Sequence, residues 1–274
     1  MEQLDSTMIS YEGATGRIEA YLSRPKTSEP RPAIIVIHEV FGLVDHTKDV
    51  ANRFAAQGYV ALAPNLFSGD PQLRSALTSS NIRMTMQFMR TIPPQKMRDT
   101  SYVQQELTKQ SEEKRAVLQR TTRLLFGGLP KDKLTQDLVK AVDYLNSQTF
   151  VKRGKVGSVG FCFGGGMSIN LACHAETAAC VIFYGENPSP IELVKNVKCP
   201  VLGIYGGEDE RINATVDQLV RAMIQYKKDF EMRLYPGAPH AFFNDTSPTT
   251  YREEAAKEAW DRVLRFYART LQAG

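Results

Sequence analysis

The sequence predicts an α/β fold, with a mostly parallel central sheet that carries helices on both faces. Residues 33–37 read Ala-Ile-Ile-Val-Ile, a wholly apolar run of the kind found in strands buried on both sides of a parallel sheet. Further apolar runs of similar length alternate with segments of helical periodicity, as they do in βαβ units. A chain of 274 residues is long enough to bury a large core. We therefore predict one domain that covers residues 1–274.

The N-terminal part of the chain predicts an edge hairpin followed by one strand–helix–strand unit. Residues 7–11 and 17–22 alternate irregularly between apolar and polar side chains, and glycines between them favour a turn. They are expected to pair as an antiparallel edge hairpin. The strand at 33–37 leads through a loop into a helix that Gly58 stops, and a second strand follows at 59–63.

Residues 69–133 interrupt this alternation. The segment is long, polar and rich in Arg, Gln, Thr and Met, with apolar residues at helical spacing, such as Met84, Phe88 and Met89. It is expected to be a helical insertion. Two interpretations stay open: the helices pack against the edge of the sheet, or they cap an active site.

The C-terminal half resumes the alternation of strands and helices. Further strands are predicted at residues 155–160, 180–184, 201–205 and 230–235. Helices are predicted at 163–173, at 216–226 and, as a long amphipathic element, at about 248–271.

A strand, the pattern Gly-x-Cys-x-Gly and a helix follow one another around Cys162. This is the arrangement of a nucleophile elbow, in which Gly160 and Gly164 allow a strained turn. The N-terminus of the following helix favours a thiolate, and the amide N–H of Phe163 is placed to donate to an oxyanion. The alternative is a small buried thiol in a glycine-rich turn. A phosphate loop is disfavoured, because no Lys-Ser or Lys-Thr follows the glycines.

Asp209 and His240 follow the next two predicted strands. The chain order nucleophile, acid, histidine is that of a hydrolase built on this kind of sheet. Ligands of parallel α/β sheets bind beyond the carboxyl ends of the strands, where Cys162, Asp209 and His240 all fall. Taken singly, Asp209 could be a helix N-cap and His240 a surface-loop residue. Together the three predict a catalytic triad.

Five stretches of the sequence carry a resemblance to a known family. They read Val-Ile-His-Glu-Val-Phe-Gly at 36–42, Ala-Leu-Ala-Pro-Asn-Leu at 61–66, Gly-Phe-Cys-Phe-Gly-Gly at 160–165, Gly-Gly-Glu-Asp at 206–209 and Pro-His-Ala-Phe at 239–242. The sequence resembles the dienelactone hydrolases (carboxymethylenebutenolidases) of the α/β-hydrolase superfamily. The similarity extends over roughly residues 17–267. It implies an α/β-hydrolase fold and a hydrolase of esters or lactones.

The resemblance also implies roles for individual residues. It makes Cys162 the nucleophile of a thioester mechanism, with Asp209 and His240 as its acid and base. Glu39 would hold and activate the thiol before substrate binds; its alternative is a loop carboxylate in a surface ion pair. No metal or organic cofactor is required by this mechanism.

The oxyanion and substrate contacts are expected around the same loops. The resemblance implies that the amide of Val40 is the second oxyanion donor, beside that of Phe163. Phe41 and Phe242 are the expected apolar substrate contacts, although core packing is the alternative for at least one of Phe242 and Phe243.

One departure from the family concerns the substrate's carboxylate. Family members that act on dienelactone hold this group with arginines, and Asn244 stands here where one of them would fall. The other would lie in the insertion, where the candidates are Arg74, Arg83, Arg90, Arg98, Arg115, Arg120 and Arg123. A site without one bidentate clamp is expected to bind an anionic lactone less well.

Composition excludes several other classes of function. The formal net charge is +4 and the basic residues are interleaved with acidic ones, so no nucleic-acid partner is expected. The chain shows no signal sequence and no apolar run of roughly 18 residues, which predicts a cytoplasmic location without membrane contact. The four cysteines have no metal-site spacing. His38-Glu39 is similar to the start of a zinc-protease motif, but the second histidine is missing because position 42 is Gly.

Three functions compete on these grounds. The first is a dienelactone-type hydrolase acting on a small-molecule ester or lactone. The second is a broader carboxylesterase or thioesterase on the same scaffold. The third is a binding protein that keeps the fold without turnover. The expected assembly is a monomer or a small homo-oligomer.

Overall fold

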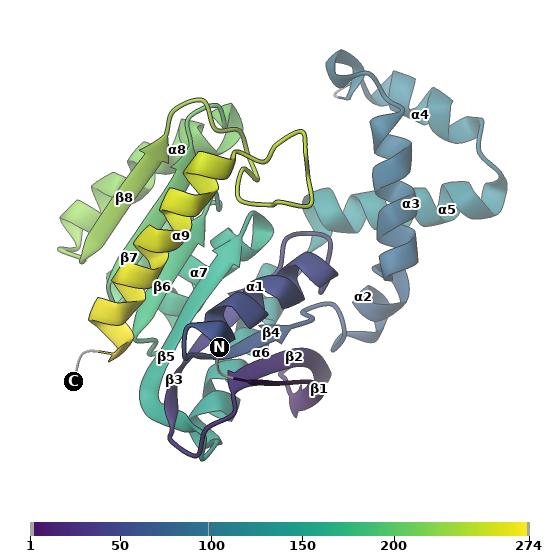
Figure 1. Cartoon of the computed structure of the whole chain (residues 1–274). Coiled ribbons are helices and arrows are strands. Elements are labelled where there is room, and N and C mark those ends of the chain that lie inside the picture. The colour runs from purple at the N-terminus through teal and green to yellow at the C-terminus, as the bar shows by residue number, and fades with distance from the viewer. Residues whose placement is uncertain (1–2, 98, 273–274) are drawn as a thin grey trace.

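The computed structural model describes residues 3–97 and 99–272, and within them one eight-stranded sheet forms the centre of the molecule (Figure 1). Its strands are β1 (Leu4–Glu12), β2 (Arg17–Pro25), β3 (Arg31–Ile37), β4 (Val60–Pro64), β5 (Val151–Phe161), β6 (Ala179–Phe183), β7 (Val201–Gly206) and β8 (Phe230–Tyr235). Their order across the sheet is β1-β2-β4-β3-β5-β6-β7-β8. The pairs β1–β2 and β2–β4 are antiparallel, and all the other pairs are parallel. The predicted edge hairpin and the mostly parallel sheet are confirmed.

Helices cover both faces of this sheet. The main ones are α1 (Asp45–Ala56), α6 (Lys131–Ser147), α7 (Phe163–His174), α8 (Glu210–Gln225) and α9 (Glu253–Tyr267). Successive side chains of a strand point to opposite faces, and β3 shows the result. Ile34 and Val36 belong to the core shared with α1 and α9, whereas Ile35 and Ile37 belong to the core shared with α6 and α7. This double burial explains the unbroken apolar run in the sequence.

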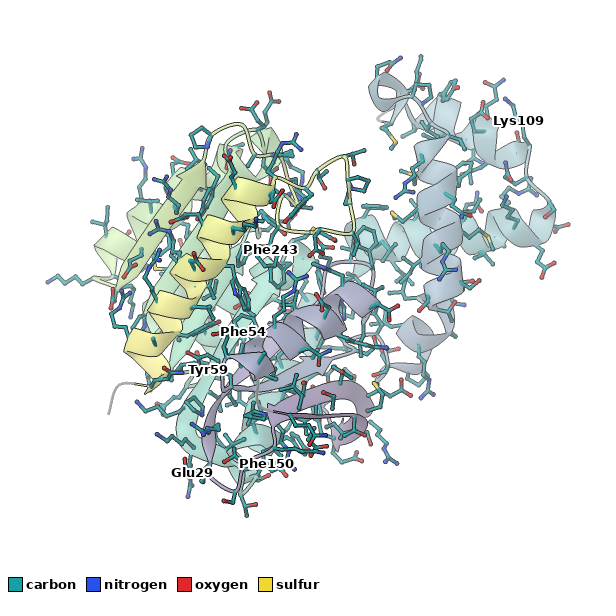
Figure 2. All side chains as sticks on the ribbon, in the orientation of Figure 1. Glu29, Phe54, Tyr59, Lys109, Phe150 and Phe243 are labelled. Atoms are coloured by element: carbon teal, nitrogen blue, oxygen red, sulfur yellow. The ribbon has the colours of Figure 1, made fainter. Side chains whose placement is uncertain are left out.

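An aromatic cluster joins the two helices on the first face. The ring of Phe54 in α1 lies 4.6 Å from that of Trp260 and 5.8 Å from that of Tyr267, both in α9. Tyr59 directly precedes β4, and its ring lies 6.0 Å from that of Tyr267. Figure 2 labels Phe54 and Tyr59 in this cluster. The C-terminal helix is thus anchored to the N-terminal half of the chain.

The insertion is helical, as predicted, and projects from one side of the molecule (Figure 1). Its elements are α2 (Pro71–Ala76), α3 (Ser79–Arg90), η1 (Pro94–Lys96), α4 (Thr100–Thr108), α5 (Glu112–Arg123) and the π-helical segment η2 (Leu124–Gly128). Its outer part has a small apolar core of its own, formed by Phe88, Ile92, Leu107 and Leu118. Its base belongs to the main core, because Leu125 and neighbouring side chains pack there.

Some elements differ from the prediction, among them α8, which begins at Glu210 and not at about 216. Helix α6 (Lys131–Ser147) was not expected as a separate helix, although its apolar positions recur at helical spacing. The C-terminal helix begins only at Glu253, not at about 248. The N–H of Arg252 donates to the carbonyl of Phe242 at 3.0 Å, so residue 252 is tied to the loop after β8 in an extended conformation. Within the described residues, no helix combines the length and the apolar character needed to cross a membrane.

Candidate active site

Cys162 stands at the sharp turn between β5 and α7. Its backbone has φ 57° and ψ −116°, a conformation that strains residues other than glycine. Close packing surrounds the turn: a Cβ at Gly160 would lie 1.8 Å from the carbonyl oxygen of Gly164, and a Cβ at Gly164 would lie 2.3 Å from that of Ile37. The N–H of Cys162 donates to the carbonyl of Phe183 at 3.0 Å. The thiol is therefore held at the carboxyl end of β5, in the elbow geometry that the sequence predicts.

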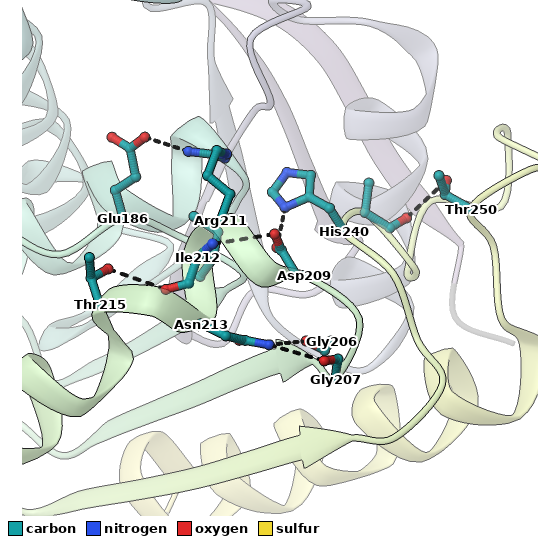
Figure 3. A network of polar contacts seen from close by, with 11 residues as sticks. Glu186, Gly206, Gly207, Asp209, Arg211, Ile212, Asn213, Thr215, His240 and Thr250 are labelled. Carbon is teal, nitrogen blue, oxygen red and sulfur yellow. Dashed lines mark hydrogen bonds and ion pairs between the residues drawn. The ribbon is translucent and has the colours of Figure 1, made fainter. Parts of the chain in front are cut away.

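Asp209 and His240 meet at the same edge of the sheet. They come from the loops after β7 and β8, and a hydrogen-bonded ion pair joins His240 Nδ1 to Asp209 Oδ2 (Figure 3). Asp209 is buried and also caps α8, since its other oxygen accepts from the N–H of Ile212 at 3.4 Å. The cap and the contact with histidine thus coexist in one side chain.

The surroundings of His240 favour its protonated form. Burial alone would lower the pKa of His240, but hydrogen bonds to Asp209 and Cys162 outweigh it and raise the pKa to about 10. Asp209 therefore orients the ring of His240, and the sulfur of Cys162 faces that ring. A histidine in this position is well suited to accept a proton from the thiol.

Neighbouring side chains fix the position of the His240–Asp209 pair. Asn213 Nδ2 donates to the carbonyl oxygens of Gly206 and Gly207, at 2.8 and 3.3 Å, and so holds the loop that carries Asp209 (Figure 3). The ring of Tyr184 lies 5.0 Å from that of His240. Both contacts limit the movement of the pair.

Glu39 is buried beneath this site. It follows β3, is 5% exposed, and its Oε2 accepts a hydrogen bond from Asn244 Nδ2 at 2.9 Å. Burial raises the pKa of Glu39, and the bond from Asn244 and the charge of His240 offset only part of that rise. Asn244 Oδ1 accepts in turn from the N–H and the hydroxyl of Thr246, at 3.0 and 2.6 Å. Glu39 is thus held by an amide and is no surface ion-pair partner.

His38 holds the loop that carries Glu39. Its Nδ1–H donates to the carbonyl of Glu39 at 2.6 Å, and its Nε2 accepts from the N–H of Leu66 at 3.1 Å. Complete burial lowers its pKa to about 4, so the ring is neutral. Both ring nitrogens are occupied, which makes His38 a structural residue. In the part of the chain that the structure describes, no group of three or more His, Cys, Asp or Glu side chains could hold a metal ion.

A cavity of about 540 Å³ opens at Cys162 and His240. This volume lies in the range of small-molecule sites. The apolar part of its wall comes from the loop after β3, from α7 and from the insertion, and consists of Val40, Phe41, Met86, Leu125, Phe126, Leu129, Phe163 and Met167. The insertion therefore borders the cavity through α3, η2 and the residues just after η2. Its outer helices pack on one another instead.

The two expected oxyanion donors border this cavity. Phe163 is the first residue of α7, so its amide N–H has no acceptor within the helix. The N-terminus of α7 adds a positive potential at the same point. Val40 follows Glu39 in the loop after β3 and also lines the cavity.

Charged side chains that the sequence did not indicate line the rim. The carboxylate of Glu186 accepts from Lys131 at 2.8 Å and from Arg211 at 2.7 Å (Figure 3 shows the second contact). The three residues come from separate elements, and each looks like an ordinary solvated charge in the sequence. No pattern in the chain could have grouped them.

One expected substrate contact is corrected. Phe242 is fully buried, with its ring 5.1 Å from that of Tyr235 and 5.7 Å from that of Tyr184, so it packs in the core and not in the cavity. Phe41 does line the cavity. Of the candidate arginines, Arg98 lies outside the described residues, and the cavity-lining residues include none of Arg74, Arg83, Arg90, Arg115, Arg120 and Arg123. The described cations at the cavity are Lys131 and Arg211 instead.

A second hollow lies at the other end of the strands, where β5, β6 and β7 begin. It has about 920 Å³, is open to solvent, and is lined mainly by polar side chains such as Asn146, Arg153 and Lys198. None of the candidate catalytic residues borders it. The smaller cavity is therefore the candidate active site.

Sequence comparison identifies relatives across the chain. Residues 18–271 match the model of the dienelactone hydrolase family. A protein from Saccharolobus solfataricus named "Putative carboxymethylenebutenolidase" is 40% identical over 261 residues, which cover 95% of this chain and 97% of that protein. A protein of the same name from Methylorubrum extorquens is 29% identical over 92% of this chain and 77% of its own length.

Solved structures share the fold. A "putative dienelactone hydrolase" from Klebsiella pneumoniae matches with a TM-score of 0.72 and 24% identity, over 97% of this chain and 99% of its own. A dienelactone hydrolase-like promiscuous phosphotriesterase from metagenomic libraries matches with a TM-score of 0.69 and 23% identity, over 97% and 98% of the two chains. The molecule accordingly has the α/β-hydrolase fold. By its sequence match over residues 18–271, the chain belongs to the dienelactone hydrolase family.

Proposed function

We propose that this protein hydrolyses a carboxylic ester or lactone, with Cys162 as the nucleophile. The observation that carries the proposal is one cavity bordered by both Cys162 and His240, the latter bonded to the buried Asp209. Relatives named carboxymethylenebutenolidase support an ester or lactone as the bond that is cleaved.

The first half of the reaction transfers the acyl group to sulfur. His240 Nε2 takes the proton of the Cys162 thiol, while Nδ1 stays bonded to Asp209. The thiolate attacks the carbonyl carbon, and the electron pair of the C=O bond moves to oxygen. The amides of Val40 and Phe163 stabilise that oxyanion. The carbonyl re-forms, the ester C–O bond breaks, and the alcohol leaves with the proton from His240.

The second half releases the acid. A water molecule gives a proton to His240, and its oxygen attacks the thioester carbon. The C–S bond then breaks, and the sulfur of Cys162 recovers the proton from the imidazolium. In a lactone, the alcohol and the acid stay parts of one molecule. The balance needs water alone, with no oxidant or reductant.

Glu39 acts in the resting enzyme. Burial raises its pKa, so this carboxyl keeps a proton more readily than an exposed one, and its charge interacts with that of His240. In the proposed cycle it keeps Cys162 ready before substrate enters, and His240 takes over once substrate is bound.

The cavity favours a substrate with an apolar part. Its wall carries Phe41 and Phe126, and the charges of Lys131 and Arg211 are both shared with Glu186 at the rim. Asn244, where an arginine would grip an anionic lactone, is bonded to Glu39. These features support the broader carboxylesterase or thioesterase activity as the second candidate.

A substrate panel tests the proposal. Turnover of a dienelactone, of short-chain and longer-chain aryl esters and of an acyl thioester is measured for the parent and for Cys162→Ala. The proposal predicts turnover of at least one class, its loss in the variant by at least about 10³-fold, and its loss in the parent on thiol alkylation. A preference for the dienelactone would favour the first candidate, and a preference for aryl esters or thioesters the second. Tight binding without turnover of any of them would contradict both.

A further inference from the structure

β8 leaves one edge of the sheet without a partner. It lies at the outer end of the strand order and, in the part of the chain that is described, pairs with β7 alone (Figure 1). The N–H of Val201 donates to the carbonyl of Asp229 at 2.9 Å, and that of Gly207 to the carbonyl of Tyr235 at 2.8 Å. Alternate residues of a strand direct their backbone groups to the same side. The backbone N–H and C=O groups of Glu231 and Arg233 therefore also point towards β7.

Among the described residues, no strand pairs with the outward backbone groups of β8, and these groups belong to its apolar residues. By the same alternation, Phe230, Met232 and Leu234 direct their N–H and C=O groups outward. Met232 is 45% exposed and Leu234 is 43% exposed, although both side chains are large and apolar. Phe230 packs against the cluster that contains residues of α8. An apolar edge strand with free backbone groups is a template for another strand.

Charges lie on the opposite face of the same strand. Glu231 pairs with Arg269, and the guanidinium of Arg233 lies over the ring of Tyr235. One acidic and one basic residue thus flank Met232 symmetrically in the sequence.

We propose that β8 is the contact surface for a second copy of this chain. The two β8 strands pair antiparallel about a twofold axis at Met232, which continues the sheet from one molecule into the next. Met232 then lies opposite Met232 of the second copy, and the two residues exchange both backbone hydrogen bonds. Leu234 lies opposite Phe230 on the apolar face, and Glu231 lies opposite Arg233 on the charged face.

The charges select this register. Moving the axis to Glu231 would place two carboxylates opposite each other, and moving it to Arg233 would place two guanidinium groups opposite each other. Like charges directly across an antiparallel pair are destabilising, whereas opposite charges are favourable. A twofold contact needs a self-complementary surface, and β8 is self-complementary only about Met232 among these three positions.

Analytical ultracentrifugation of the full chain over a wide concentration range tests the dimer. The parent is expected to dimerise reversibly. Met232→Lys should weaken dimerisation by at least about tenfold, because each copy would bring a charge to the apolar face. Met8→Lys is the matched control, since Met8 is 50% exposed on β1 at the other edge of the sheet, and it should leave dimerisation unchanged. Ester hydrolysis and the melting temperature of each variant verify folding.

Charge exchange tests the register. Arg233→Glu alone should weaken the dimer, and adding Glu231→Arg to it should restore the dimer. Cysteines provide a direct measurement: Glu231→Cys and Arg233→Cys proteins, incubated with oxidised glutathione, should form a disulfide when mixed and little when separate. In the proposed register, residues 231 and 233 of the two copies lie opposite each other without exchanging backbone hydrogen bonds. The Cα atoms of such a pair are about 4.5 Å apart, within the reach of a disulfide. The parent gives the background from its own cysteines.

Three results would overturn the inference. One is a parent protein that stays monomeric up to high micromolar concentration. Another is a dimer that Met232→Lys and Met8→Lys affect equally, which would locate the contact elsewhere. The third is cross-linking that is as strong in the separate cysteine variants as in their mixture. None of them bears on the proposed hydrolysis, which depends on the cavity at Cys162.

Discussion

Asn244 determines how the carboxyl of Glu39 is held. The family resemblance implies an arginine at this position. The side chain of Asn244 instead points to the buried Glu39 and not to the cavity. The residue beside the buried acid is thus a neutral amide, which donates a hydrogen bond and brings no charge. The carboxyl keeps a raised pKa as a result, since one hydrogen bond offsets only part of the cost of burial.

Asn244→Ala should move the activity profile to higher pH. The amide of Asn244 lowers the pKa of Glu39, so removing it raises that pKa further and delays formation of the carboxylate as pH rises. The acid limb of kcat/KM against pH is expected to shift upward and the plateau to fall by about tenfold, the cost of one buried charge-assisted hydrogen bond. Asn146→Ala is the control, because Asn146 bonds the Gly154 N–H far from the site. An unchanged acid limb would show that Glu39 does not take part before substrate binds.

Sequence reasoning reached the residues that have a fixed order along the chain. Cys162, Asp209 and His240 follow strand ends, and the elbow glycines identify the first of them. The bond from Asn244 to Glu39 and the rim formed by Lys131, Glu186 and Arg211 could not be predicted. They depend on side-chain directions between elements that are distant in sequence, and charged residues on helices look alike in a sequence.

The strand–turn–helix element around Cys162 depends on glycine for packing as well as for conformation. Gly160→Ala should lower the free energy of unfolding by more than about 3 kcal/mol, because its Cβ would overlap the Gly164 carbonyl oxygen at 1.8 Å. Gly127→Ala is the control, since a Cβ there meets nothing within 4 Å. Urea unfolding of both variants measures the difference. Equal stabilities would mean that the elbow is looser than these distances indicate.

Of the parts of the insertion that border the cavity, η2 carries the exposed aromatic side chain of Phe126. Phe126 in η2 is 58% exposed and lines the cavity, which is an unusual position for a large aromatic ring without a bound partner. Phe126→Ala should lower kcat/KM for bulky apolar esters by about 10- to 100-fold and leave acetyl esters nearly unchanged. Met97→Ala, an exposed change in the same insertion away from the cavity, should do neither. An equal loss for large and small esters would point to a structural defect instead.

Prediction of elements succeeded where burial is simple. Strands buried on both faces are unbroken apolar runs, so β3, β4, β6 and β7 are plain in the sequence. Helix α6 was overlooked although Gly127, Gly128 and Pro130 mark a break before it, because its first residues were counted with the polar insertion. The start of α9 was placed too early. The hydrogen bond from Arg252 to Phe242 delays the helix, and a contact between residues ten positions apart could not be read from the local sequence pattern.

At the scale of the whole molecule, the ion pair of His240 with Asp209 makes the free energy of unfolding depend on pH. The pKa of His240 is raised from 6.5 to about 10 in the folded protein, so folding is favoured by its protonation. This contribution is fully present below pH 6.5 and is lost as pH rises towards 10. It depends on loops after two different strands, and thus on the intact sheet.

Asp209→Asn should therefore destabilise the protein in a pH-dependent way. Asparagine keeps the N-cap of α8 but loses the charge, so the deficit in unfolding free energy should be largest just below pH 6.5 and shrink towards pH 10. Urea unfolding across this range measures it. Asp217→Asn on the exposed side of α8 is the control and should show a small deficit without pH dependence. A constant deficit in Asp209→Asn would contradict the link to His240.

The central claim is that an acyl group passes through the sulfur of Cys162. Intact-protein and peptide mass spectrometry, after rapid acid quenching of turnover with an activated aryl ester, tests it most directly. The account predicts a mass increase equal to the acyl group, located on the peptide with Cys162 and absent from Cys162→Ala, which should also lose turnover. An acyl group on another residue, or full turnover by Cys162→Ala, would contradict it.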